Sequence, residues 1–136
     1  MRLTANSRLP GSTITAGKEL LRVHKNYQPL LKRVPSRLIK GLAHITGGGL
    51  IDNLPRILPP NRDAIIETKS WRVPRIFQIL QQNGNVDAQE MYQVFNMGIG
   101  MVAVVAEQYA QRAASILRAK QIGRIERGLG KTVLKL

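Results

Sequence analysis

Three consecutive glycines, Gly47, Gly48 and Gly49, lie between two apolar segments and constrain the fold more than any other feature of this chain. Glycine inside regular structure costs roughly 0.5–1 kcal/mol relative to alanine, so a run of three indicates a special turn. The residues before it, 39–46, form a short run with β-branched members, which predicts a strand. The residues after it, 50–58, have apolar positions at helical spacing around Pro55, which predicts a short or kinked helix.

The remaining sequence alternates between helix-like and strand-like segments. Helices are predicted over 17–32 with a break or restart at Pro29, over 74–84, after an N-cap at Asp87, and over 107–120. Strands are predicted over 64–68, 98–106, 122–125 and 132–136, and the run 98–106 is apolar enough to be a central strand. This order predicts an α/β or α+β domain, a layered unit with helices packed on a sheet. Residues 1–16 have little periodicity and are predicted to be a linker or tail, which leaves 17–136 as the domain.

Composition excludes several classes of protein. The chain has 136 residues, which suits one domain, and 43% of them are hydrophobic, as in ordinary globular proteins. It has no cysteine, so disulfides, thiolate metal sites and cysteine nucleophiles are excluded. No apolar run is long enough for a membrane span, and the N-terminus lacks the apolar core of a secretory signal. We therefore expect a cytoplasmic protein without a membrane partner.

The net charge of +13 suggests a polyanionic partner, but the charge is unevenly placed. Residues 1–40 carry nine basic and one acidic residue, and residues 111–136 carry seven basic and one acidic. The stretch between them, 41–110, carries five basic and six acidic residues and is nearly neutral. A non-catalytic domain that binds nucleic acid through its basic ends is therefore an alternative function. The scarcity of aromatic residues, 4%, and the lack of a known nucleic-acid motif argue against it.

The glycine run is the best candidate for chemistry. Backbone N–H groups without neighbouring Cβ atoms can approach an anion closely, and a following helix start adds unsatisfied donors. Thr46 can add a hydroxyl group, and Arg56 could reach back as a bidentate phosphate partner. The alternative is a tight turn with nothing bound. The loop is neither a P-loop nor a dinucleotide-binding fingerprint, since their spacings are absent.

A second glycine-containing segment, Phe95 to Met101, opens the most apolar strand. Gly98 in that strand marks either a close approach of a ligand or packing room for a helix. His24 and His44 are the only histidines, and the carboxylates are scattered, so no metal site is predicted. His44, beside the glycines, is either an acid, base or phosphate donor or a structural histidine. These residues alone predict an anion-binding α/β domain.

At these two motifs the chain resembles the AIR synthetases, the phosphoribosylformylglycinamidine cyclo-ligases. The resemblance rests on Gly41 to Leu50 (GLAHITGGGL), Asn53 to Pro59 (NLPRILP) and Phe95 to Met101 (FNMGIGM). Trp71, Pro74 and the run Glu90-Met91-Tyr92 follow in the family's order and spacing. The match extends from about residue 10 to the C-terminus and corresponds to the family's C-terminal domain.

The resemblance implies ATP-dependent ring closure of formylglycinamidine ribonucleotide to aminoimidazole ribonucleotide, a ligase step of purine biosynthesis. Positioning and charge stabilisation carry such a reaction. The family has two α/β domains, and its active site lies in a cleft formed with the N-terminal half, which binds most of the ATP and Mg2+. The complete enzyme is expected to be a homodimer. No stretch of this chain resembles the N-terminal half, so we expect that half as a partner and expect the chain alone to be inactive.

The resemblance also assigns site residues. His44 is the candidate catalytic residue, and Thr46, Gly47, Gly48 and Gly49 are the candidate phosphate loop. Asn53 and Arg56 are expected to support it as polar groups, while Asn96 and Gly98 are expected to line the cleft from a neighbouring strand.

Overall fold

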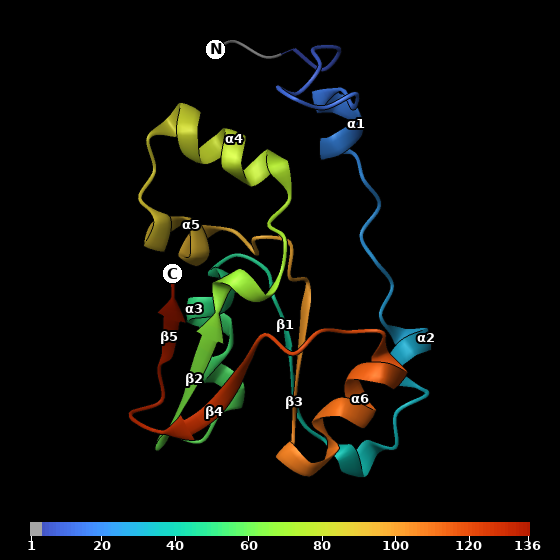
Figure 1. Cartoon of the computed structure of the whole chain (residues 1–136), viewed down its shortest axis with the longest axis vertical. Helices are drawn as coiled ribbons and strands as arrows, with labels where there is room; N and C mark the ends of the chain where they lie inside the picture. The colour runs from blue at the N-terminus through green and yellow to red at the C-terminus, as the bar shows by residue number, and fades with distance from the viewer. Residues whose placement is uncertain (1–3) are drawn as a thin grey trace.

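The computed structural model describes residues 4–136 and contains two small β-sheets surrounded by short helices (Figure 1). The first sheet is the antiparallel pair β1 (Ile39–His44) and β3 (Met101–Val105). The second sheet has the order β4–β2–β5. In it β2 (Arg62–Glu67) pairs antiparallel with β4 (Gly123–Arg127) and parallel with β5 (Thr132–Lys135). The mixture of helices and sheets confirms the predicted α+β class.

The helices are short and lie between the strands in sequence. The α-helices are α1 (Ala16–Leu20), α2 (Gln28–Leu31), α3 (Gly49–Asn53), α4 (Arg75–Gly84), α5 (Ala88–Val94) and α6 (Ala110–Leu117). Single 3-10 turns are η1 (Ser36–Leu38), η2 (Pro55–Ile57), η3 (Thr68–Ser70) and η4 (Glu107–Tyr109). Across residues 4–136 no helix has the length and apolarity needed to cross a bilayer.

Several predicted helix boundaries are confirmed at the level of single residues. The carboxylate of Asp87 accepts the backbone N–H groups of Gln89 and Glu90, so Asp87 is the N-cap of α5. Pro74 was predicted in the first turn of this helix and lies at the N-cap of α4, one position before the observed first residue, Arg75. Pro55 ends α3 and starts η2, which is the predicted kink.

The main core lies where both sheets meet α3 and α5. Its buried members are Ala43, Ile45, Leu50, Leu54, Ala64, Ile66, Met91, Tyr92 and Met97. Ile45, Leu50, Leu54 and Met91 are buried to 1% exposure or less. The core includes residues of β1 and α3, the two elements that flank the glycine run, so the core holds that run in place.

The predicted helix over 17–32 is wrong. The structure has α1 and α2 with an extended segment between them, and Leu21, Val23 and His24 in that segment are exposed. The apolar side chains at helical spacing have no core to face there, and a helical pattern without packing gains little stability. Pro29 lies in the first turn of α2, so it restarts a helix as predicted.

The prediction that 98–106 is a central strand is also wrong. The strand begins later, at Met101, and belongs to a sheet of two strands, in which β1 is its one partner among residues 4–136. All five of its residues are half-buried. An apolar run indicates that a strand is covered, but it does not specify which strands pair with it.

Part of the predicted tail, 1–16, is packed. Residues 1–3 lie outside the described part. Arg8 and Thr15 form an isolated β-bridge, and Leu9 and Ala16 bury themselves against Ile79 of α4. The side chain of Arg75 donates to the carbonyl oxygen of Pro10. The division of the chain at residue 16 stays a prediction.

Candidate functional site

The glycine run forms the turn between β1 and α3, as its position in the sequence indicates. The N–H of Gly49 donates to the carbonyl of Thr46 at 3.0 Å, which closes the turn. The N–H groups of Thr46, Gly47 and Gly48 make no hydrogen bond within residues 4–136. Thr46 and Gly47 are exposed. The turn therefore presents three consecutive free amide donors, the arrangement that an anion requires.

The three glycines have different structural roles. Gly49 has a φ of 55°, and a Cβ there would overlap the carbonyl oxygen of Tyr92. Gly48 has a φ of 95°, and its Cβ would lie 2.8 Å from the Cβ of Asp52. A Cβ on Gly47 would meet nothing within 4 Å. The fold therefore requires glycine at 48 and 49, whereas at Gly47 the side of the loop is open to a ligand.

The buried side chain of Asn53 stabilises this turn through hydrogen bonds to its backbone. Its side chain is buried, at 5% exposure, and its amide nitrogen donates to the carbonyls of Gly47 at 3.2 Å and Gly49 at 2.8 Å. Both carbonyls are thereby directed inward. Asn53 is thus a positioning residue of the loop in this structure, and its amide hydrogens are already used.

Most of the second predicted motif forms a turn that precedes β3. Only Met101 lies on the strand, and Asn96 and Gly98 do not open it as expected. The side-chain oxygen of Asn96 accepts the N–H of Gly98 at 2.9 Å, and its carbonyl accepts the N–H of Ile99 at 2.8 Å. Gly98 has a φ of 92°, and a Cβ there would lie 2.5 Å from the Cδ of Pro74. The indole N–H of Trp71 donates to the carbonyl of Met97. The contact with Pro74 favours the packing interpretation of Gly98.

The fold brings the two motifs together. The backbone of Gly49 packs against the carbonyls of Tyr92 and Phe95, at the end of α5 that leads directly into Asn96. The N–H of Ile45 donates to the carbonyl of Gly100 at 3.0 Å, which joins the two turns on the other side. Segments about fifty residues apart in sequence therefore form one continuous surface.

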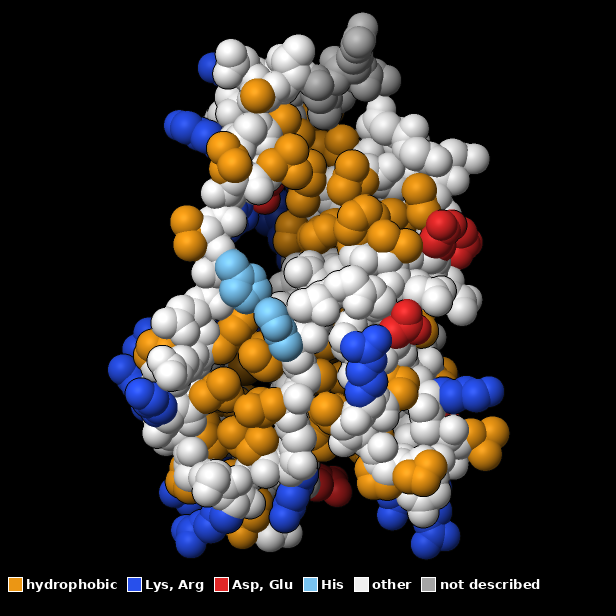
Figure 2. Space-filling model, turned by 180° about the vertical axis from the view of Figure 1, so that it is seen from behind, with side chains coloured by type: hydrophobic (Ala, Val, Ile, Leu, Met, Phe, Trp, Pro, Cys, Tyr) orange, Lys and Arg blue, Asp and Glu red, His pale blue; other side chains and the backbone are white. Residues whose placement is uncertain are grey.

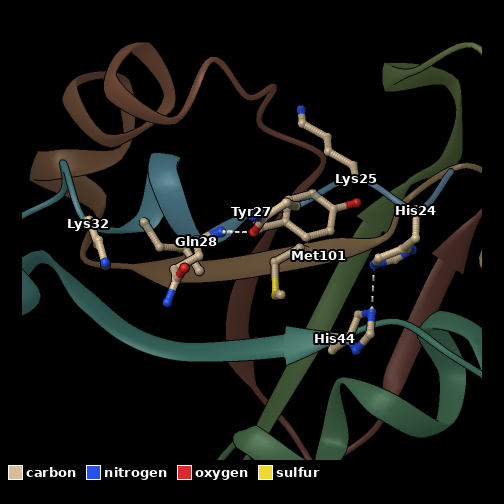
Figure 3. Close-up of a pocket in the computed structure, with 9 residues that line it drawn as sticks. His24, Lys25, Tyr27, Gln28, Lys32, His44 and Met101 are labelled. Carbon is tan, nitrogen blue, oxygen red and sulfur yellow. Dashed lines mark hydrogen bonds between the residues drawn. The ribbon is translucent and has the colours of Figure 1, made fainter.

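His44 is exposed at the end of β1 and contacts the only other histidine. Its Nε2 lies 3.3 Å from the Nε2 of His24, and the two rings are tilted by 60° (Figure 3). Figure 2 shows the pair on one face of the molecule, above a hollow with exposed hydrophobic side chains. His44 is therefore accessible, which excludes the buried structural histidine that was the alternative.

An open hollow of about 620 Å³ lies beside the histidine pair. Its lining includes Lys25, Tyr27 and Lys32 from the segment around α2, and Met101 from β3. In Figure 3 these side chains surround a space that His24 and His44 border on one side. Two lysines and two imidazoles around one hollow favour an anionic ligand over a cationic one.

Sequence reasoning missed His24, Lys25 and Tyr27 as neighbours of His44. Twenty residues separate the two histidines, and no spacing rule connects a strand with a segment that was predicted to be helical. The one available signal was that the chain contains only two histidines. Asp52 was also missed, although its position four residues after Gly48 places it against the loop.

The electrostatics of the loop are mixed. Arg56 is exposed on η2 and makes none of the hydrogen bonds or ion pairs found within residues 4–136, so its guanidinium is available. Asp52 is exposed next to Gly48 and adds a negative charge. Burial raises the pKa of the Tyr92 phenol, and a side-chain hydrogen bond with Thr68 lowers it by a smaller amount. No cluster of three or more potential metal-ligating side chains occurs in the described chain.

Comparison with known proteins identifies a matching family and several relatives of this chain. A family model described as the C-terminal domain of AIR synthase related proteins matches residues 4–134. A phosphoribosylformylglycinamidine cyclo-ligase from Caldicellulosiruptor bescii is 43% identical over 128 residues, which is 90% of this chain and 38% of the relative. The enzyme of the same name from Chromobacterium violaceum is 55% identical over 91 residues, 67% of this chain and 26% of the relative. That of Neisseria gonorrhoeae is 47% identical over 109 residues, 80% of this chain and 29% of the relative. The chain thus spans well under half the length of these relatives.

Proposed function

Because the chain belongs to the family of AIR synthase related C-terminal domains, we propose that it is the C-terminal part of a phosphoribosylformylglycinamidine cyclo-ligase. The proposed reaction is the ATP-dependent closure of the imidazole ring, from formylglycinamidine ribonucleotide to aminoimidazole ribonucleotide. This chain supplies one wall of the active-site cleft, and an N-terminal half supplies the other. The complete enzyme is a cytoplasmic homodimer.

The free N–H groups of Thr46, Gly47 and Gly48 are the observation that carries the proposal. The substrate is a ribonucleotide, and its phosphate is a compact anion with several acceptor oxygens. A hydrogen bond from an amide to a charged group contributes roughly 1.5–3 kcal/mol, so a few such donors suffice for binding. The proposal adds two further donors, the hydroxyl of Thr46 in the same exposed turn and the exposed guanidinium of Arg56 on η2.

His44 is the proposed catalytic residue of this wall. It is exposed two residues before Thr46, and its ring can donate or accept a proton while His24 contacts its Nε2. Asn53 keeps the loop carbonyls turned inward, and the turn that contains Asn96 and Gly98 borders the loop through Gly49 and Ile45. In the proposal all of these residues position the substrate and stabilise its charge, and none forms a covalent bond to it.

The Mg2+ ion and most of the ATP are assigned to the N-terminal half. The described residues offer no set of three metal-ligating side chains, although the carboxylate of Asp52 lies against the loop. The described residues of this chain therefore do not fit a magnesium site by themselves, and the roles proposed for them do not involve a metal ion.

A reconstitution assay tests the proposal. The chain is mixed with the separately produced N-terminal half of the Chromobacterium violaceum relative, formylglycinamidine ribonucleotide, ATP and Mg2+, and aminoimidazole ribonucleotide is measured. We expect product in the mixture and none with the chain alone. No product from halves that are folded and associated would contradict the proposal.

The net charge of +13 supports one alternative, a polyanion-binding domain that uses its basic ends. Such binding depends strongly on salt, because each neutralised phosphate releases a counterion. Titration with single-stranded DNA at several salt concentrations distinguishes the two functions. Binding at low salt whose affinity falls steeply as the salt concentration rises from about 0.05 M to 0.2 M would favour the alternative.

A further inference from the structure

One edge of β3 has no partner within residues 4–136, because its sheet contains only β1 and β3. The bond from the N–H of Ile45 to the carbonyl of Gly100 fixes which residues of the ladder are hydrogen-bonded pairs. In an antiparallel ladder, the backbone N–H and C=O of successive residues point alternately toward the partner strand and toward the opposite edge. Counting along the register places the N–H and C=O of Ala103, opposite Leu42, at the free edge. A free edge of this kind can pair with an added strand.

The β3 edge lacks the charges that usually prevent strand addition. Its sequence is Met-Val-Ala-Val-Val, without a single polar side chain. β4 also lines the groove and is an edge strand of its sheet, but it carries the exposed charges of Arg124, Glu126 and Arg127. Charged residues on an edge strand block pairing with another chain. Of the two edges, β3 is therefore the one that is open to a partner.

An apolar groove of about 680 Å³ accompanies this edge. Small and apolar residues of α6 form one wall, and these are Ala110, Ala113, Ala114 and Leu117. Leu54, Ala64 and Ile66 of the main core also line it. A strand added to β3 could thus satisfy its backbone at the edge and bury alternate side chains in the groove.

Charge selects the chemistry of the occupant. The groove has three basic residues at its border, Lys25, Arg118 and Lys120, and one acidic residue, Glu107. A fourth basic residue there, Arg124, already forms ion pairs with Glu67 and Glu126. This rim favours an apolar strand flanked by carboxylates. A second copy of this chain is disfavoured, because two molecules of charge +13 repel each other.

We propose that the groove beside β3 takes an extended apolar segment from the N-terminal half of the cyclo-ligase. The proposal rests on the proposed function. The matched relatives are two to four times longer than their aligned part, and the family model describes a C-terminal domain, so these proteins have further chain that precedes it. The added strand extends the β1–β3 sheet and joins the two halves into one structure.

Two pairs of variants test the docking surface. Ala103→Pro removes the outward N–H of β3, and Leu42→Pro is its control, since Leu42 lies opposite and turns its N–H to the other edge of the sheet. Ala114→Glu places a charge in the groove, and Ser115→Glu places the same charge on the exposed side of α6. The proline pair changes the sheet of β1 and β3, whereas the glutamate pair changes α6. If a proline variant does not fold, the glutamate pair still tests the docking surface.

Binding is measured with overlapping twelve-residue peptides that cover the N-terminal half of the Chromobacterium violaceum relative. Trp71 is the only tryptophan and lines the groove, so its fluorescence reports occupancy. We expect one apolar peptide to bind, to slow amide exchange at Ala103, and to lose at least tenfold in affinity with A103P and A114E but not with L42P or S115E. Absence of a binding peptide, equal affinity for all variants, or occupation of the β3 edge by a second copy in sedimentation and cross-linking would overturn the proposal.

The reconstitution assay separates this proposal from the proposed function. Product formation that A103P and A114E leave unchanged would disprove the docking site while the cyclo-ligase activity stands. Peptide binding at the groove without product in any mixture would disprove the activity while the docking site stands.

Discussion

At the residue scale, the glycine run separates into two positions required by the fold and one that is available for binding. Gly48 and Gly49 have φ values of 95° and 55°, which other residues rarely adopt, whereas Gly47 faces open space. A substitution at Gly48 would therefore strain the turn whether or not a ligand binds. Gly47 is the position at which the phosphate hypothesis can be tested without disturbing the fold.

We predict that Gly47→Ala leaves stability nearly unchanged and weakens phosphate binding. The added methyl group contacts no protein atom within 4 Å, and in the phosphate hypothesis it takes up space beside the free N–H groups that the bound anion needs. A loss of roughly one hydrogen bond to a charged group, about 1.5–3 kcal/mol, corresponds to at least a tenfold weaker affinity. Inorganic phosphate is titrated while the amide signals of residues 46–48 are followed by NMR.

Gly49→Ala is the matched variant, and it should fail for a different reason. Its positive φ alone costs about 1–2 kcal/mol for a residue with a Cβ, and the Cβ would also overlap the carbonyl oxygen of Tyr92. Urea denaturation should therefore show a clear loss of stability for Gly49→Ala and almost none for Gly47→Ala. Equal stability losses for both variants would contradict the division of roles.

Asp52 allows a prediction of opposite sign. Its exposed carboxylate lies against Gly48 and repels an anion held by the loop. We predict that Asp52→Asn strengthens phosphate binding about twofold to fivefold, the range expected for exposed charges. The gain should disappear in 1 M salt, where screening acts over about 3 Å. Unchanged or weaker binding at low salt would place the anion away from this turn.

At the element scale, Asp63 of β2 ties the connection between β4 and β5 to the sheet. Its Oδ1 accepts the N–H groups of Leu129 and Lys131, each at 2.8 Å. These backbone bonds, from Lys131 first and Leu129 second, lower the pKa of Asp63 below 3.8. A lowered folded-state pKa stabilises the fold at pH above 3.8, and this stabilisation is lost as the pH falls through the folded-state value.

Asp63→Asn should therefore reduce the acid sensitivity of stability. The wild-type chain is expected to lose stability as the pH falls below about 4, the unfolded-state range of an aspartate. The asparagine variant is expected to be less stable at pH 7 and to lose less over the same acid range. Thermal unfolding from pH 7 to pH 3 measures both, and identical pH profiles of the two proteins would refute the role of Asp63.

Local signals predicted individual elements well, because each depends on a few neighbouring residues. The strand that leads to Gly47, the kink at Pro55 and the cap at Asp87 are all confirmed. The errors concern what lies across space. The helical pattern over 17–32 has no core to face, and the apolar strand 101–105 has a single partner strand within residues 4–136. The contact of His24 with His44 also depends on tertiary structure, and the twenty-residue spacing between them does not predict it.

At the scale of the whole molecule, two features point to a larger assembly. The most apolar strand is half-buried beside an apolar groove, and a basic rim surrounds that groove. Hydrophobic stabilisation is proportional to the area removed from water, so an occupant of the groove would stabilise the fold. The groove beside β3 is thus the surface at which we propose that a partner segment joins this chain.

The last prediction concerns whether the described chain unfolds as one unit. Leu9, Ala16 and Ile79 form a cluster that is separate from the main core. Helix α4 connects the two, because it contains both Ile79 of the cluster and Phe77, which packs against the main core.

We predict that Leu9→Ala detaches the N-terminal segment while the main core stays folded. The reporters are the amides of Leu9 and Ala16, which donate to Ile14 and Ser7, and their hydrogen exchange should become fast. Exchange in β1 and β2 should change less than threefold, because a local opening leaves the global free energy of unfolding nearly constant. If β1 and β2 lose protection together with Leu9 and Ala16, the segment and the main core are one cooperative unit, and residues 8–16 belong to the domain and not to a tail.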